Sequence, residues 1–193
     1  MTLILREPSL ELADSFVRMR DAFLAVGEDE WTGRHALAHS DVPAWIAALR
    51  RRARGEEIPD EWIPWVPEAD YWAVLDGEVV GDLGLRHPLN QWLEQLGGNI
   101  GYSTHPQHRG RGIATFLLRE GLKILGRKGL TEAIVTCRDD NVASISAIEK
   151  CGGIRLTDTD RSIFPIPVGS RRRYAVPVPP TPESSIRRFE VDD

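Results

Sequence analysis

The spacing of hydrophobic side chains changes along this chain between a helical and a strand-like period. Leu12, Phe16, Met19 and Phe23 recur at steps of four, three and four residues, which places them on one face of a helix. The same period, together with capping residues, predicts four helices. The first runs through Phe23 with Ser9 as its N-cap, and the second covers 41–53 with Asp41 as its N-cap. The third covers 111–126, and the fourth covers 141–150 and is ended by Gly152-Gly153.

Short apolar and β-branched runs predict the strands. The strongest signal is Asp76-Gly77 between the runs 71–75 and 78–85, because Asp-Gly suits the tight turn of a hairpin. The other expected strands are 3–6, 99–104, 133–137, 154–156 and 173–176. Strands that alternate with helices in this order indicate an α/β (α+β) fold with a mixed sheet covered by helices.

Length and composition exclude several classes of protein. The 193 residues fit one domain with a sizeable core, and we expect a domain over residues 1–177 and a flexible, polar tail over 178–193. No run of about 18 apolar residues exists, and Met1 does not begin a signal peptide, so we expect a cytoplasmic protein without a membrane partner. Two cysteines, Cys137 and Cys151, make neither a disulfide framework nor a metal site.

Charge is divided unevenly between the two halves of the chain. Residues 1–96 contain 18 acidic and 9 basic side chains, whereas residues 97–193 contain 11 and 15. The net charge of −5 argues against a nucleic-acid partner, despite the basic run Arg171-Arg172-Arg173. The division becomes informative only if each half can be tied to a ligand.

A glycine-rich stretch between an expected strand and an expected helix carries the clearest chemical signal: Gln107-His108-Arg109-Gly110-Arg111-Gly112-Ile113-Ala114. A helix start exposes unpaired amides and the positive end of the helix dipole. Glycines at 110 and 112 let the backbone approach a bulky anion, which a Cβ would obstruct. With Arg109 and Arg111 beside them, they predict a pyrophosphate site. A dinucleotide fingerprint fits worse, since Thr115 stands where a third glycine is needed.

Gln-x-x-Gly-x-Gly between a strand and a long helix resembles the acyl-CoA motif of the GNAT superfamily of N-acetyltransferases. More narrowly, the chain is similar to a bacterial group of predicted acetyltransferases. The matching segments are Gly97 to Tyr102, Thr136-Cys137, Asp140 to Gly153 with Ile148-Glu149-Lys150, and Arg173-Tyr174. The resemblance spans about residues 1–177 and implies a mixed, mostly antiparallel sheet of about six or seven strands, splayed between strands 4 and 5.

The resemblance also implies a donor site for acetyl-CoA. Main-chain groups of Tyr102, Ser103 and Thr104 would bind the pantetheine arm. The pyrophosphate would lie on Gln107, Arg109, Gly110, Arg111, Gly112, Ile113 and Ala114. Asn141 and Ser144 would also contact the donor, although Asn141 equally suits a helix N-cap.

The family's usual acid and base are missing at their positions, because Ile148 and Asn99 stand there. Tyr102 and Ser144 are candidates for catalysis, and a helical Ser144 hydroxyl more often bonds its own backbone. Glu94 and the histidines at 87, 105 and 108 are further candidates for the base, although His105 and His108 in the donor motif better suit a structural or phosphate-facing role. Trp31, Trp62 and Trp65, and with them Trp92, lie among acidic residues and are candidates for the acceptor side through cation–π contact, or they simply pack loops.

The sequence therefore leaves two functions open. The first is an N-acetyltransferase that carries acetyl from acetyl-CoA to a primary amine of a small molecule or peptide by direct attack. The second is a catalytically weak acyl-CoA-binding sensor of the same fold. Neither function needs a metal ion, and both are compatible with a homodimer.

Overall fold

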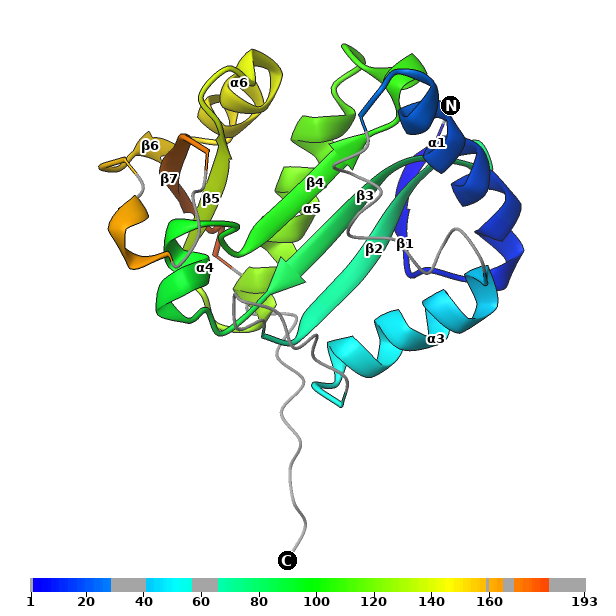
Figure 1. Cartoon of the computed structure of the whole chain (residues 1–193), viewed down its shortest axis with the longest axis horizontal. Coiled ribbons are helices and arrows are strands. Elements are labelled where there is room, and N and C mark those ends of the chain that lie inside the picture. Colours follow the sequence, from blue (N-terminus) through cyan, green and yellow to red (C-terminus); the bar gives the residue numbers. More distant parts are fainter. Residues whose placement is uncertain (1, 29–40, 57–65, 159, 165–168, 181–193) are drawn as a thin grey trace, which may run out of the picture.

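The computed structural model describes residues 2–28, 41–56, 66–158, 160–164 and 169–180, and Figure 1 shows their arrangement. The strands are β1 (Leu3–Arg6), β2 (Glu68–Leu75), β3 (Glu78–Arg86), β4 (Ile100–Thr104), β5 (Glu132–Arg138), β6 (Ile154–Arg155) and β7 (Arg171–Pro177). The helices are α1 (Ala13–Ala25), α3 (Val42–Ala53), α4 (Gln91–Gln95), α5 (Ile113–Arg127) and α6 (Val142–Lys150), with 3-10 turns at Leu10–Leu12, Pro106–His108 and Arg161–Ile163.

The described strands form one sheet in the order β1-β2-β3-β4-β5-β7-β6. All neighbouring pairs run antiparallel except β4 and β5, which are parallel and share a single pair of residues, Ile100 and Val135. The expected mixed, mostly antiparallel sheet that opens between its fourth and fifth strands is confirmed. The division at residue 177 stays a prediction.

Helices cover the two faces of the sheet with separate cores (Figure 1). On one face, Phe16 of α1 stacks on Trp45 of α3 and Trp72 of β2, with ring centroids 4.5 and 4.8 Å apart. On the other face, α5 buries Leu117 and Leu118 against β3 and β4. Aromatic and aliphatic burial of this kind supplies the main stabilising free energy of the domain.

Three local expectations differ from the structure. Ser9 stands before a 3-10 turn, and its side chain makes no capping hydrogen bond there. The helix expected from residue 111 begins at Ile113, because Gly112 adopts a left-handed conformation with φ of 81°. The helix α4 was not expected; the Asn90 side chain caps it by accepting hydrogen bonds from the amides of Trp92 and Leu93.

The helices in the described ranges are all too short or too polar to cross a membrane. The same residues contain no group of three or more His, Cys, Asp or Glu side chains that could hold a metal ion.

Asn99 joins three strands at the point where β4 and β5 begin to separate. Its amide group donates to the Arg86 carbonyl (2.9 Å), and its Oδ1 accepts the backbone N–H of Ile134 (2.8 Å). Its backbone C=O accepts the N–H of Arg86 (2.9 Å), and its backbone N–H donates to the Ile134 carbonyl (2.7 Å). The guanidinium of Arg86 donates to the Gly98 carbonyl at 2.7 Å and is itself paired with the buried Glu68 at 3.3 Å. This buried network, here called the Asn99 junction, fixes where the sheet opens.

We expect Gly98→Ala to destabilise the fold strongly. Gly98 has φ of 66°, and an added Cβ would overlap the Ile134 carbonyl of the Asn99 junction. Left-handed strain costs about 1–2 kcal/mol and the overlap adds about 1–3 kcal/mol. Gly129→Ala is the matched control, because it has φ of 91° and nothing within 4 Å of its added Cβ. Chemical denaturation compares the two variants, and equal losses would contradict the role given to the junction.

Candidate functional site

The gap between β4 and β5 leaves part of β4 without a strand partner on that side. Asn99 and His105 flank β4, and their backbone bonds with Arg86 and Val80 show which positions face β3. Because partners alternate along an antiparallel pair, the N–H and C=O groups of Tyr102 and Thr104 face the gap instead. Among the described strands only Ile100 pairs with β5, so this edge can pair with an extended ligand.

The N-terminus of α5 lies directly after this strand and its 3-10 turn. No side chain among the described residues caps α5, and the backbone enters it through Gly110 and Gly112, with φ of 76° and 81°. A Cβ built on either glycine meets nothing within 4 Å, so open space surrounds both. A long helix with uncapped first-turn amides and an open glycine approach is suited to bind a phosphate group.

Two neighbouring groups fit the same ligand. The side-chain oxygen of Thr104 is buried, and no described residue forms a hydrogen bond with it. The Arg111 side chain is exposed beside Gly112. Three features therefore follow one another: a free strand edge, a buried hydroxyl without a partner and a helix N-terminus. Together they match the amides and the phosphates of an acyl-CoA arm. The residues present therefore fit the predicted donor.

Tyr102 and Ser144 meet across the gap, although 42 residues separate them. Tyr102 comes from β4 and Ser144 from the first turn of α6, and their hydroxyl oxygens lie 2.8 Å apart. Asn141 caps α6 by accepting the Ser144 amide at 3.0 Å, which confirms its expected role as an N-cap. The Ser144 hydroxyl thus bonds another side chain rather than its own helix, contrary to the more common behaviour.

Burial sets the protonation of the groups around this pair. It raises the pKa of Tyr102 to about 12, against the smaller lowering effect of the bond to Ser144, so the phenol stays protonated at neutral pH. Burial also raises the pKa of the Cys137 thiol, which lies on β5 near Ser144. Tyr102 therefore keeps its proton at neutral pH and can donate it in a hydrogen bond to Ser144, and Cys137 is a neutral thiol.

Three other residues that the sequence points to near the site have structural roles. Asn99, at the position of the family's base, is 4% exposed and holds the Asn99 junction. Ile148, at the position of the acid, is buried in the core. His105 accepts the Gln107 amide through Nδ1 at 3.2 Å, and burial and then His108 lower its pKa.

A match to a family model decides the family. The model of the acetyltransferase (GNAT) domain matches residues 2–154. The chain belongs to the GNAT acetyltransferase family. This agrees with the resemblance carried by the glycine motif and with the sheet that opens between β4 and β5.

Similar proteins include an enzyme and two solved structures. The mycothiol acetyltransferase of Geodermatophilus obscurus is 26% identical over 155 residues, which are 77% of this GNAT chain and 48% of the relative. This chain thus spans about half the length of the curated relative that it matches.

The solved structures share the fold. RimL, a ribosomal L7/L12 alpha-N-protein acetyltransferase in complex with coenzyme A, has a TM-score of 0.66 and 16% identity, with 92% of this chain and 95% of that chain covered. RimJ of Mycobacterium smegmatis, in complex with CoA disulfide, has a TM-score of 0.64 and 24% identity, with 90% and 80% covered.

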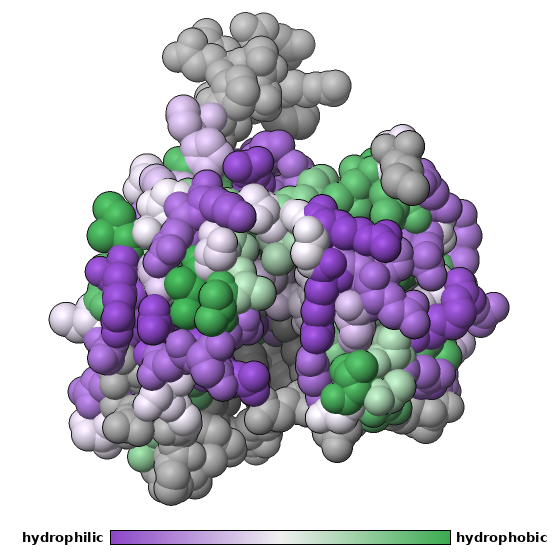
Figure 2. Space-filling model, turned by 90° about the horizontal axis from the view of Figure 1, so that it is seen from above, coloured by the Kyte–Doolittle hydropathy of each residue, from purple (hydrophilic) through white to green (hydrophobic). Residues whose placement is uncertain are grey.

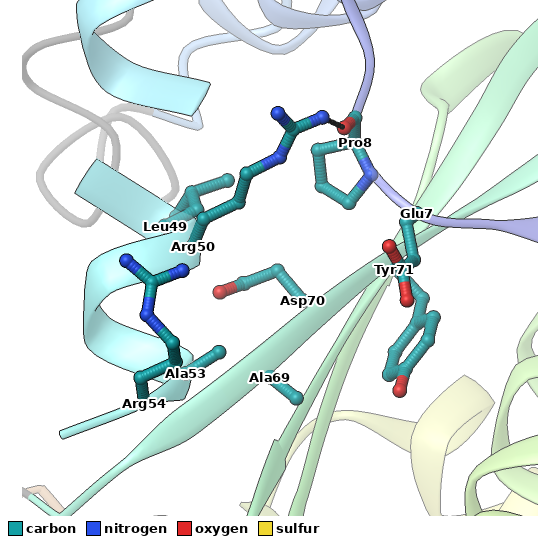
Figure 3. A pocket seen from close by; sticks show the side chains of 9 residues that line it. All are labelled: Glu7, Pro8, Leu49, Arg50, Ala53, Arg54, Ala69, Asp70 and Tyr71. Atoms are coloured by element: carbon teal, nitrogen blue, oxygen red, sulfur yellow. Dashed lines mark hydrogen bonds between the residues drawn. The ribbon is translucent and has the colours of Figure 1, made fainter. Parts of the chain in front are cut away.

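The basic run at the end of α3 lies apart from the gap of this GNAT fold. It borders a cavity of about 300 Å³ lined by α3, β2 and the residues after β1, which Figure 3 shows. There Arg50 donates to the Pro8 carbonyl at 3.3 Å, and Arg54 pairs with Glu56 at 2.6 Å. These contacts agree with a helix end stabilised by cations rather than with a second ligand site.

The predicted acceptor side is only partly visible in the structure. Trp31, Trp62 and Trp65 lie outside the described residues. Trp92 packs on Phe164 with ring centroids 5.6 Å apart, joining α4 to the segment before β7. Seen from above, the surface is mostly hydrophilic and is hollowed between the side of α6 and the side of α1 (Figure 2).

We expect Gly112→Glu to abolish CoA binding while the protein stays folded. The added carboxylate would stand at the uncapped N-terminus of α5, where it would occupy the open space and repel a pyrophosphate. Gly129→Glu is the matched control at the other end of α5, with a similar positive φ and open surroundings. Titration calorimetry with CoA measures the effect, and an unchanged affinity in Gly112→Glu would refute the phosphate site.

Proposed function

We propose that this chain transfers an acetyl group from acetyl-CoA to a primary amine of a small molecule or a peptide, by direct attack of the amine. The observation that carries the proposal is the meeting of Tyr102 and Ser144 at 2.8 Å beside the unpaired edge of β4. An acyl-CoA that extends from the glycine approach of α5 along this edge would bring its thioester toward these hydroxyls.

The residues predicted for the donor form one continuous path. Gln107 to Ala114 provide the turn and the helix amides for the pyrophosphate. On β4, Tyr102 and Thr104 provide main-chain groups for the pantetheine amides, whereas the main chain of Ser103 faces Asp82 of β3. Complexes of RimL with coenzyme A and of RimJ with CoA disulfide support this type of donor for a chain of the same fold.

The chemistry requires stabilisation of a departing thiolate. Acetyl-CoA supplies an activated acyl group, and the carbon–sulfur bond breaks when the amine nitrogen bonds its carbonyl carbon. The nitrogen loses one proton as it becomes an amide, and that proton neutralises the departing thiolate, directly or through water. If Tyr102 donates its hydrogen to Ser144 Oγ, the Ser144 hydrogen can turn from the neighbouring Cys137 thiol toward the sulfur of the donor. Ser144 also lies at the positive end of α6, which favours a developing negative charge.

A base within the described part of the chain is not needed for this proposal. Direct attack requires an amine that arrives neutral or loses its proton to water, and Asn99 and Ile148 are structural residues of the domain. The acceptor class rests on the relatives: the names of RimL and of the mycothiol acetyltransferase describe a protein N-terminus and a small molecule, respectively.

We expect Ser144→Ala to lower kcat by about 10- to 100-fold, the value of a hydrogen bond to a charged group. Tyr102→Phe should lower kcat less, and the double variant should be no worse than Ser144→Ala, because Tyr102 acts through Ser144. Ser146→Ala, on the same helix and similarly half-buried, is the matched control and should leave kcat unchanged. Additive losses in the double variant would contradict the relay.

Release of free thiol from acetyl-CoA with a panel of amines and peptide N-termini tests the proposed reaction. We expect at least one primary amine to give turnover that Ser144→Ala reduces. The sensor alternative is favoured by the loss of an acid at Ile148 and of a base at Asn99. CoA binding by calorimetry without thiol release from any amine would establish the sensor and refute the transferase.

A further inference from the structure

An ion pair links the acidic first half of the chain to the glycine loop, residues 107–112, of the proposed donor site. Arg109 donates both ends of its guanidinium to the Glu28 carboxylate, at 2.8 and 2.7 Å. The two residues lie 81 positions apart, Glu28 just after α1 and Arg109 directly before Gly110. Two parallel charge-assisted bonds fix the orientation of both side chains as well as their distance.

The aromatic ring of Phe23 supports the same arrangement from α1. The Arg109 guanidinium lies 5.7 Å from the centroid of this ring, within the range of a cation–π contact. Phe23 is 2% exposed, so its ring is a rigid surface. Arg109 is therefore held against α1 by two independent contacts, rather than lying in the open space around Gly110 and Gly112.

We infer that Glu28 is a positioning residue for donor binding, which acts through Arg109 by tying the end of α1 to the glycine loop. This inference rests on the proposed donor site and goes beyond it. Arg109 is then not a phosphate ligand but a residue that holds the glycine loop against α1, here called a strut. The contact is specific to the guanidinium, because lysine cannot form the two-pronged bond.

The Glu28–Arg109 contact acts where the loop is least supported, at its glycines, because the 3-10 turn before them is already held by the bond from the Gln107 amide to His105. Glycine at 110 and 112 gives the backbone wide conformational freedom, and no described side chain caps the helix that follows. On the other side of the turn, His108 Nε2 lies 3.6 Å from the Glu78 carboxylate. The bond from Arg109 lowers the pKa of the Glu28 carboxyl, so the pair persists at neutral pH and weakens only as the pH falls.

A direct phosphate contact by Arg109 would behave in the opposite way. Glu28 would then compete with the pyrophosphate for the guanidinium, and its removal would strengthen donor binding. If Arg109 is a strut, removing either partner weakens donor binding by the same factor, and removing both adds nothing.

The experiment measures CoA binding by calorimetry in Glu28→Gln, Arg109→Gln, the double variant and Arg109→Lys. We expect each to raise the dissociation constant by about two- to fivefold, the worth of an exposed ion pair, with no further loss in the double variant. Glu120→Gln is the matched control, because it breaks the exposed Glu120–Lys123 pair on α5 and should leave CoA binding unchanged. Tighter binding by Glu28→Gln, or full binding by Arg109→Lys, would overturn the inference.

Amide hydrogen exchange separates this inference from the donor proposal. In the protein without ligand, Glu28→Gln should raise the exchange of the amides from Gln107 to Gly112 by several-fold and leave α5 beyond its first turn unchanged. Unchanged exchange in the loop would refute the strut even if CoA binds. Absence of CoA binding by the unaltered protein would refute the proposed function, whereas the exchange result would still decide whether Glu28 orders the loop.

Discussion

The fold depends on the junction at Asn99, where a single polar side chain holds β3, β4 and β5 together at one end of the sheet. Buried polar groups are stabilising only when they are satisfied, and here the amide of Asn99 bonds one backbone group on each side. The bonds from Arg86 and its pairing with Glu68 extend the network toward β2. Beyond the adjoining pair of Ile100 and Val135, β4 and β5 continue without backbone pairing to each other. The sheet therefore opens between β4 and β5 where the hydrogen bonds of the Asn99 junction end.

Two helices direct their N-termini toward the site that this opening creates. The first turn of α5 follows β4 through the glycine loop, and the first turn of α6 follows β5 through Asn141. Because β4 and β5 are parallel, their following helices start at the same end of the sheet. Their positive ends converge on a region suited to the negative charges of a pyrophosphate and a departing thiolate.

Much of the fold could be predicted from local sequence. The Asp76-Gly77 turn, the cap at Asp41, the cap at Asn141 and the glycine loop each depend on neighbouring residues, so short patterns were sufficient. The pairing of Tyr102 with Ser144 and of Glu28 with Arg109 could not be predicted, because sequence spacing does not specify contacts between distant segments. Asn99 shows the same limit: its residue type excluded a base, but its partners on three strands appear only in the folded sheet. α4 was missed because five residues carry too little periodicity, although Asn90 was an available capping signal.

The single residue pair between β4 and β5 has a mechanical consequence. One half of the sheet, with β1 to β4, and the other, with β5 to β7, are joined by backbone bonds at one end only. At the open end, the described contact across the gap is made by side chains, above all Tyr102 and Ser144. The width of the opening can therefore be changed by side-chain substitution without breaking a strand pair. Under the proposed function, replacing residues at these two positions would change the space next to the acyl group, while the position at which the sheet divides stays constant.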